Sequence, residues 1–289
     1  MAVGTYTLVA LSDINAYLGY TTGADTARDN LLEKLADRAT TMMENYCDRK
    51  FKSRTYRNER YDGDGSEWLF LDNFPIISIN RIGIGTRKAL DIQCTDDSAT
   101  FASIDLDADS LTITQIGGTN EGSSDLAFNT YSTVSALAAA INGFANWEAD
   151  VATDMGSYPA SDLLDVWGQY CLDTEVGLYV INEALNDFSI WRDGGKQIGV
   201  VYRSAGWTAG VRNIIVTYTA GYTTIPEDLK QICIELAATL YNRRNRDWDL
   251  VGETLGDYTW RAGAGASRAV IPPHLQSALG PYRRIPIVG

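Results

Sequence analysis

The residues that could carry chemistry in this 289-residue chain are few and widely separated. The single histidine, His274, lies in a proline-rich stretch, beside no evident nucleophile or carboxylate that could complete a catalytic group. The chain has no Gly-x-Ser-x-Gly elbow, no phosphate-binding P-loop and no His-Glu-x-x-His motif. We therefore expect a protein that is not an enzyme and that requires no cofactor.

Two acidic stretches have part of the spacing of a calcium site. Asp105, Asp107 and Asp109 alternate, so on a strand they would share one face, but the sixth and twelfth positions counted from Asp105 do not fit a calcium loop. The stretch Asp62-Gly-Asp-Gly-Ser66 begins like such a loop, but its twelfth position is Asn73 where a glutamate is needed. A solvated acidic edge and no metal is the main expectation, with a cation at residues 105–109 as the open alternative.

The cysteines and the start of the chain indicate a reducing compartment. Cys47, Cys94, Cys171 and Cys233 are far apart and form no Cys-x-x-Cys pair, so buried thiols are expected rather than a zinc site or disulfides. The first residues lack the basic and apolar regions of a signal peptide. No apolar run approaches the ~20 residues that a membrane-spanning helix needs. We expect no membrane contact.

Charge divides the chain into segments. Residues 89–191 contain 17 acidic residues and no Lys or Arg, whereas the rest of the chain holds 24 basic and 20 acidic residues. From Tyr258 onward there are four arginines and no acidic residue. A shift of this kind marks segment boundaries. We expect an N-terminal core half at 1–88, an inserted acidic α+β domain at 89–195, a second core half at 196–250 and a flexible arm at 251–289.

The strongest structural signal lies between residues 214 and 246. β-branched residues predict a strand from Ile214, which Ala220-Gly221 ends. Pro226 suits the first position of the helix that follows, acidic residues occupy its first turn and arginines its last. An apolar stripe at helical spacing predicts packing along its whole length. The residues expected to pack are Leu229, Ile232, Leu236, Leu240 and Tyr241.

Other elements follow from local patterns. Short and long helices are expected at 12–19 and 26–46, with strands at 54–61, 67–71 and 76–84, and the glycine-rich stretch 62–66 as a tight turn between the first two strands. In the acidic middle we expect strands at 99–104 and 110–116, a helix from about residue 133 to Gly143 and a strand from Trp147.

The order of these signals resembles the head–tail connector proteins of tailed bacteriophages, also called adaptor or head-completion proteins. The resemblance rests on Tyr218-Thr-Ala-Gly-Tyr222 followed by Ile225-Pro-Glu-Asp-Leu229 and a helix ending in Leu240-Tyr-Asn-Arg-Arg244. The N-terminal region agrees through Glu44-Asn-Tyr-Cys-Asp-Arg49 and Phe74-Pro-Ile-Ile77. It covers roughly residues 5–88 and 205–285, and the long acidic middle departs from it.

The resemblance implies an α+β fold with a helical-bundle connector core, β-hairpins, an inserted small α+β domain and an extended C-terminal arm. It also implies a structural virion protein that forms a ring of twelve copies at the neck, after assembly in the host cytoplasm. Its partners would be further copies of itself, the portal protein and the tail or next neck protein. DNA would pass through the channel without specific binding.

The C-terminal arm would contact the portal in this reading. Its apolar residues have no evident local partner in the sequence, and its arginines suit carboxylates on another protein. The residues expected at that contact are Leu275, Leu279, Tyr282, Arg283, Arg284, Ile285 and Ile287. The alternative is an adhesion or carbohydrate-binding protein that acts through exposed tryptophans of the acidic domain. Ring assembly favours the first reading, and a monomer that binds glycans favours the second.

Overall fold

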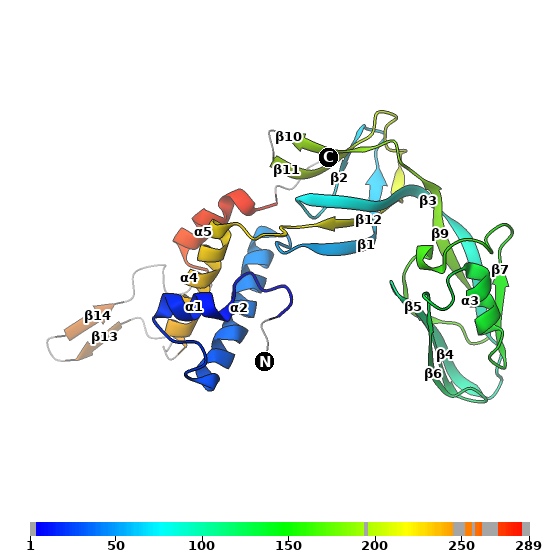
Figure 1. The fold of residues 1–289 in the computed structure, drawn as a ribbon, viewed down its shortest axis with the longest axis horizontal. Helices are drawn as coiled ribbons and strands as arrows, with labels where there is room; N and C mark the ends of the chain where they lie inside the picture. Colours follow the sequence, from blue (N-terminus) through cyan, green and yellow to red (C-terminus); the bar gives the residue numbers. More distant parts are fainter. Residues whose placement is uncertain (1–3, 194–195, 245–251, 256–257, 262–270, 285–289) are drawn as a thin grey trace.

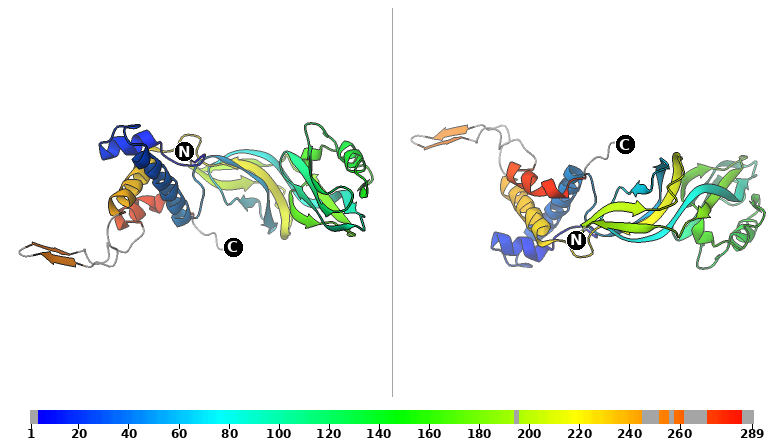
Figure 2. Two further views of the ribbon diagram at one scale, coloured as in Figure 1. Left: turned by 90° about the horizontal axis from the view of Figure 1, so that it is seen from below. Right: turned by 90° about the horizontal axis from the view of Figure 1, so that it is seen from above.

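The protein is elongated, with helices at one end, antiparallel sheets in the middle and a second β-rich unit at the other end (Figure 1). The structure is a computed structural model that describes residues 4–193, 196–244, 252–255, 258–261 and 271–284. Two further views show the same separation of the two ends (Figure 2). No helix in the described ranges is long and apolar enough to cross a membrane.

Four helices pack together at one end. They are α1 (Leu11–Leu18), α2 (Thr26–Cys47), α4 (Glu227–Arg243) and α5 (Pro273–Leu279). Asp25 caps α2 by accepting a hydrogen bond from the Arg28 N–H, and Asp48 ends it in the left-handed conformation. Ala36, Ala39 and Ala237 are fully buried, and such small side chains let α2 and α4 approach closely.

The middle of the molecule is an antiparallel sheet built on β12 (Gly210–Ala220). β12 pairs on one side with β1 (Arg54–Gly63) and on the other with β3 (Ile76–Cys94). Ile214, Ile215 and Val216 are all fully buried, so both faces of this strand are covered. A three-stranded sheet of β10 (Ser189–Asp193), β11 (Lys196–Tyr202) and β2 (Trp68–Phe70) packs nearby around the buried Trp207.

The far unit is joined to the middle by β3 itself. The second half of this 19-residue strand pairs with β7 (Trp147–Val151) and β9 (Val176–Ala184). A four-stranded sheet in the order β6 (Gly122–Ala127), β5 (Ser110–Gly117), β4 (Ala99–Leu106) and β8 (Val166–Tyr170) completes the unit. Its core also takes in α3 (Val134–Ile141), which Thr133 caps, and the short η1 (Ala160–Asp162).

Three small elements lie in the C-terminal region. β13 (Gly252–Leu255) and β14 (Tyr258–Arg261) pair with each other as a two-stranded sheet. The 3₁₀ turn η2 (Gly280–Tyr282) follows α5 directly.

The expected helical-bundle core is wrong. The described part of the chain holds fourteen strands and five α-helices, and the largest buried cluster lies in the far β-rich unit rather than among the helices. The expected extended arm is also wrong for residues 271–284, which form α5 and η2 and pack onto the helices. The rest of the arm's expected contact residues, Ile285 and Ile287, lie outside the described residues.

Two predictions about the strands are wrong, one about which strands pair and one about where a strand ends. The strands at 54–63 and 68–70 do not pair with each other, because β1 pairs with β12 and β2 with β11. The strand expected at 76–84 continues to Cys94, so the segment boundary expected at residue 89 falls inside one continuous strand. The strands expected in the acidic middle and its helix, by contrast, are confirmed by β4, β5, β7 and α3.

Candidate assembly sites

Two of the aspartates singled out for a cation accept local hydrogen bonds instead. The Asp105 carboxylate accepts a hydrogen bond from the Gly168 N–H at 2.6 Å, and Asp107 accepts from the N–H groups of Asp109 and Ser110 at 2.9 and 3.0 Å. His274 lies exposed in the first turn of α5. Within the described ranges no group of three or more His, Cys, Asp or Glu side chains could hold a metal ion.

The four cysteines are free and buried. Burial raises the pKa of Cys47 to about 11 and those of Cys171 and Cys233 to about 12. A thiol with such a pKa stays protonated at neutral pH and is a poor nucleophile. These side chains therefore serve the packed cores.

The segments that carry the family resemblance meet at one place, where the helices join the central sheet. Arg49, at the end of α2, is 5% exposed. Its guanidinium lies 3.8 Å from the ring centroid of Phe74 and 5.5 Å from that of Tyr222, and it donates a hydrogen bond to the Phe74 carbonyl. Three stretches that are far apart in the sequence are thus held by one side chain. We call this the motif junction.

A second charged residue supports the motif junction from α2. The buried Glu44 carboxylate accepts hydrogen bonds from the Phe51 N–H at 3.2 Å, from Lys50 at 2.9 Å and from Arg54 at 3.1 Å. A buried charge is tolerated when it is paired and hydrogen-bonded in this way. Glu44 therefore fixes the turn that leads from α2 into β1.

The return from β12 to α4 passes through the same place. The Tyr222 N–H donates to the Phe51 carbonyl at 2.7 Å, and the Gly221 N–H donates to the Pro75 carbonyl at 2.9 Å. Gly221 has φ of 109°, and a Cβ at this position would lie 2.8 Å from the backbone of Phe51 and Lys52. The glycine of the Thr-Ala-Gly-Tyr motif is therefore required by close backbone approach.

A second site, which sequence reasoning missed, joins the central sheet to the acidic unit. The pairing of β1 with β12 shifts between Tyr56 and Glu59, and Asn58 there adopts φ of 52°. An irregularity of this kind redirects a side chain out of the regular alternation. Here it accompanies Arg57, whose Nε donates to the Asp165 carboxylate at 2.6 Å.

Arg57 and Arg81 together hold the segment around residues 161–165. Arg57 also donates to the carbonyls of Ser161 and Leu163, at 3.3 and 3.2 Å. Arg81, on β3, donates to the Asp162 carbonyl at 2.9 Å, lies 3.0 Å from its carboxylate and reaches Asn58 at 2.8 Å. The basic residues missing from the acidic unit are therefore supplied by the central sheet. We call this contact the arginine joint.

Apolar side chains also pack at the arginine joint. Leu164, Ile181 and Ile215 form a small buried cluster that links the far unit to β12. The only sequence signal for this joint is the charge imbalance itself, because an acidic segment without Lys or Arg needs cations from elsewhere. The residue pattern gives no signal for the bulge that positions Arg57.

The C-terminal residues expected to contact a portal lie as follows. Leu275 and Leu279 are 2% and 0% exposed and pack into the helical cluster, so the expectation that they lack a local partner is wrong. The Tyr282 hydroxyl donates to Asp228, and Arg283 lies over the Tyr46 ring at 5.2 Å.

Arg284 ends the described chain beside the motif junction. Its N–H donates to the Cys47 carbonyl at 2.9 Å, and its guanidinium pairs with Asp72 and, at 4.0 Å, with Asp48. The residues expected to pack on α4 lie in the same cluster, with Leu240 half-buried and the others buried. Those others are Leu229, Ile232, Leu236 and Tyr241.

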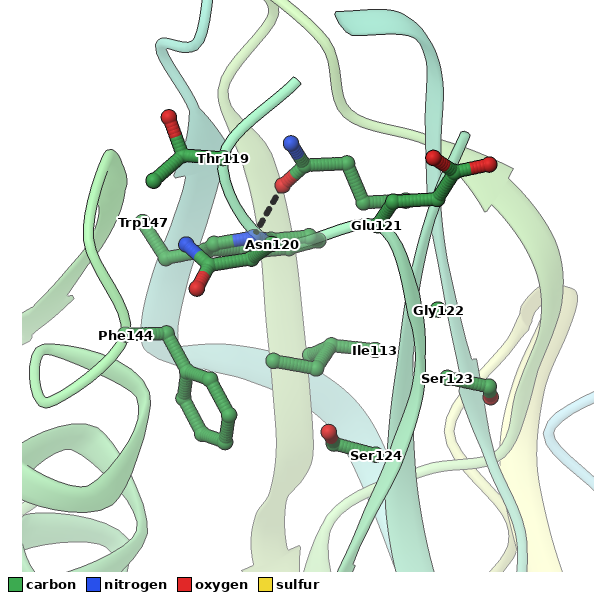
Figure 3. Close-up of a pocket in the computed structure, with 10 residues that line it drawn as sticks. Ile113, Thr119, Asn120, Glu121, Gly122, Ser123, Ser124, Phe144 and Trp147 are labelled. Atoms are coloured by element: carbon green, nitrogen blue, oxygen red, sulfur yellow. Dashed lines mark hydrogen bonds between the residues drawn. The ribbon is translucent and has the colours of Figure 1, made fainter. Parts of the chain in front are cut away.

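A cavity of about 300 Å³ opens at the edge of the four-stranded sheet, between β6 and the loop before β7. Phe144 and Trp147 line one side, and Gly122, Ser123 and Ser124 the other (Figure 3). The Trp147 indole N–H donates to the Gln115 side chain at 2.9 Å, drawn as the dashed line in Figure 3. The indole N–H is therefore already engaged and does not face an empty site.

Gln115 belongs to a buried polar network beneath this cavity. Its amide donates to Asp96 at 2.9 Å, and Asp96 also accepts from the Thr119 N–H at 2.7 Å and from Ser98 at 2.5 Å. These hydrogen bonds, that of the Ser98 hydroxyl above all, hold the pKa of Asp96 well below its usual range. The network ties the loops at residues 96–98 and 117–119 to the edge of the sheet.

Comparisons with known proteins find similarity among solved structures. No protein-family model matches the sequence, and no curated protein matches it. Among solved structures, the chain is similar to one described as "Neck of empty GTA particle computed with C6 symmetry", with a TM-score of 0.43 and 12% identity, covering 100% of this chain and 95% of that one. It is also similar to a chain of "Virion of native gene transfer agent (GTA) particle", with a TM-score of 0.38 and 13% identity over 100% and 95% of the two chains.

Proposed function

We propose that the protein is a structural subunit of the neck of a phage-like particle. In this proposal identical copies form a ring that joins the portal to the tail or to the next neck protein. The role is geometric, so it requires stable contacts and a fixed subunit shape rather than a catalytic group. The protein would assemble in the host cytoplasm and remain in the virion.

The motif junction is the observation that carries this proposal. The stretches Glu44–Arg49, Phe74-Pro75 and Tyr218–Tyr222 resemble connector proteins in sequence order, and they converge on Arg49 and Gly221 in space. Chance matches to common turns and caps have no reason to meet at one buried arginine. The convergence therefore favours a shared architecture over a set of unrelated local signals.

The arginine joint supports a role that depends on subunit shape. It fixes the acidic unit against the central sheet by ionic contacts, backbone hydrogen bonds and a small apolar cluster. A subunit of a ring needs such a fixed angle between its parts, because small angular errors accumulate around a closed ring.

DNA would pass through the ring without tight binding. The acidic unit carries no Lys or Arg between residues 89 and 191, and contacts from these cations to phosphates supply most of the affinity for DNA that does not depend on sequence. A surface of this charge lining the channel would let a duplex slide. The portal contact is assigned in this proposal to the C-terminal region, through Arg283 and the residues that follow it.

Electron microscopy of the purified full chain, alone and mixed with portal protein, tests the proposal. Closed rings that bind one end of the portal are the expected result. A protein that stays monomeric at all concentrations, and neither forms rings nor binds portal, would overturn it.

A further inference from the structure

The four-stranded sheet of the acidic unit has two different faces. Ala102 and Ile104 on β4, like Leu111 and Ile113 on β5, are buried in the core of the unit. By the alternation of a strand, the side chains between these residues lie on the opposite side of the sheet. We call that side the outer face.

A β-bulge turns a tryptophan out at the outer face. The register of β8 against β4 shifts, so that Trp167 and Gly168 together oppose Asp105. Gly168 has φ of 54°, and its N–H donates to the Asp105 carboxylate at 2.6 Å. Val166 packs against the core, whereas Trp167, the next residue, is 73% exposed. Bulges redirect side chains in this way, so the exposure of Trp167 is built into the strand.

A second aromatic residue follows Trp167 along β8. Tyr170 lies opposite Ser103, is 44% exposed, and its ring centroid is 5.8 Å from that of Phe101. Ser103 and Asp105 stand two residues apart on β4, so the positions of Tyr170 and Trp167 are separated by about 7 Å along the strand. Two exposed aromatic side chains thus line the β8 edge of the outer face.

Polar side chains occupy the other edge of the outer face, on β5 and β6. The Thr112 hydroxyl donates to the Asp125 carboxylate at 2.6 Å, and the hydroxyls of Thr114 and Ser123 lie 3.1 Å apart. Both pairs face each other directly across the two strands. A carboxylate can accept several hydrogen bonds and a hydroxyl can both donate and accept, so these groups keep capacity for a ligand.

A cavity of about 560 Å³ adjoins the outer face at Asp125. Its lining includes the carboxyl residues Asp109 and Asp125, the hydroxyl residues Ser110 and Ser161, and Asn129. This volume lies within the range of small-molecule sites. The outer face therefore runs from an aromatic edge to a polar hollow.

The charge of this surface excludes most anionic ligands. Residues 89–191 contain no Lys or Arg. Arg57 reaches the carbonyls of Asp107 and Ser161, but its guanidinium is also paired with Asp165. Phosphates and anionic polymers need cations that this surface does not offer.

A neutral sugar has the chemistry that matches both edges. One side of a pyranose ring presents C–H groups, which pack on the rings of tryptophan and tyrosine, and these rings are large, rigid contact surfaces. The rim of the sugar presents hydroxyls, which can donate to carboxylates and exchange hydrogen bonds with threonine and serine.

We propose that the outer face binds a neutral polysaccharide. Sugar units stack on Trp167 and Tyr170, and their hydroxyls bond to Asp125 and to the polar lining of the cavity. This inference goes beyond the proposed neck role and does not rest on it. In the proposed ring, several copies of the face would act together on one glycan surface, so a weak site would bind with higher avidity.

Affinity gel electrophoresis of the full chain tests this proposal, with one polymer dissolved in each gel. The neutral polymers are dextran, laminarin, hydroxyethylcellulose and galactomannan, and alginate is the anionic comparison. We expect at least one neutral polymer to retard the wild type and alginate to leave it unretarded. Titration calorimetry with the retarding polymer should depend little on added salt, because no ion pair forms.

Two variants remove the two kinds of contact. W167A deletes the exposed aromatic platform, and D125A deletes the carboxylate shared by the outer face and the cavity. Each should raise the Kd for the retarding polymer at least tenfold. Tryptophan emission gives a second readout, because the polymer should change the emission of the wild type and W167A should lose that change.

Matched controls separate loss of the site from a general effect. W191A removes a tryptophan that is 43% exposed on β10, and D150A removes an exposed carboxylate on β7. Both should bind the polymer within twofold of the wild type. Circular dichroism melts of W167A should match the wild type, because the deleted side chain lies mostly in solvent.

The outcomes are distinct. Retardation by none of the neutral polymers would overturn the inference, and so would equal affinity of W167A and the wild type. Stronger retardation by alginate than by every neutral polymer would also contradict it. A W167A protein that keeps polymer binding but loses ring or portal contact would assign the outer face to a protein interface instead. Rings without retardation would leave the neck role standing, whereas retardation of a chain that forms no ring would support this inference and contradict that role.

Discussion

At the scale of single residues, two buried charges show how this chain positions its parts. Arg49 stacks on Phe74 and Tyr222 while it donates to the Phe74 carbonyl. Glu44 accepts hydrogen bonds from the Phe51 N–H and from the cationic side chains of Lys50 and Arg54. Glu44 is buried with each of its carboxylate oxygens hydrogen-bonded, and Arg49 is held by aromatic rings and one carbonyl while its Nε has no hydrogen-bond partner among the described residues. Burial lowers the pKa of Arg49, yet an arginine remains protonated in proteins, so its contacts persist at every ordinary pH.

We predict that R49K destabilises the protein although it keeps the charge. Lysine lacks the planar group that stacks on Phe74 and reaches the carbonyl, so a loss of about 1–3 kcal/mol is expected. Chemical denaturation of the full chain measures it. The matched control is R60K, at an exposed position on β1, which should change stability by less than about 0.5 kcal/mol. Equal stability of R49K and the wild type would show that the stacking is dispensable.

Asp96 gives a prediction about pH. Its hydrogen bonds depress its pKa in the folded state, so its contribution to stability is present above the unfolded pKa of about 3.9 and is lost as pH falls below that value. We predict that D96N melts at a lower temperature than the wild type at pH 7. The gap should narrow as the pH is lowered from about 4 towards 2. A gap that stays constant over this range would show that the ionised form is not the one being stabilised.

At the scale of elements, the C-terminal helix belongs to the folded subunit. Leu275 and Leu279 fill the helical cluster, and Arg284 closes back onto Cys47 and Asp72. Removing a buried leucine costs about 2–5 kcal/mol. We therefore predict that truncation from Pro272 markedly lowers the melting temperature, whereas truncation from Ile285 leaves it nearly unchanged. Equal melting temperatures for the two truncations would show that α5 contributes little to the fold.

The arginine joint should control how the two halves are held. We predict that R57A with R81A leaves both units folded but broadens their relative orientation, because the ionic and backbone contacts to residues 161–165 are lost together. Small-angle scattering should show a larger radius of gyration or a wider distance distribution. R87A is the control, since Arg87 contacts only the Thr153 carbonyl among the described hydrogen bonds. An unchanged scattering profile for the double variant would contradict this role.

How much of this could be predicted depends on whether the determining contact is local. Helices α2 and α4 follow from caps, a proline and an apolar stripe, all of which act within a few residues. The length of β3 was missed because its middle is polar and exposed at Thr86, Arg87 and Lys88, which reads as the end of a strand. Pairing with β9 carries the strand through that stretch.

The residues of the candidate sites also divide into those whose role is set by local backbone and those whose role depends on distant contacts. Gly221 was informative because the backbone there has a positive φ and approaches other backbone closely, and Pro226 because it stands directly before the first residue of α4. Arg57 was not, because its role depends on a shift in register and on a segment more than 100 residues away. Leu275 and Leu279 stand four residues apart, as on one helix face, but the glycine- and alanine-rich stretch before them suggested an arm. Tertiary packing decided the outcome.

At the scale of the whole molecule, both the shape and the distribution of charge favour a subunit whose two ends have different surfaces. The molecule is elongated and its two ends differ in charge (Figure 1). The long strand β3 and the arginine joint connect the central sheet to the acidic unit. Such a subunit presents different surfaces at its two ends, which is what a head-to-tail ring requires. A negative unit beside a channel would also keep DNA from adhering, because it repels the phosphates and supplies no Lys or Arg to bind them.

The measurement that tests this account most directly is the mass and symmetry of the purified full chain, determined by electron microscopy and mass photometry on the same sample. The account predicts closed rings of a single size that dissociate into monomers at high salt and bind the portal at one end. Monomers at every concentration, or open filaments in the presence of portal, would contradict it.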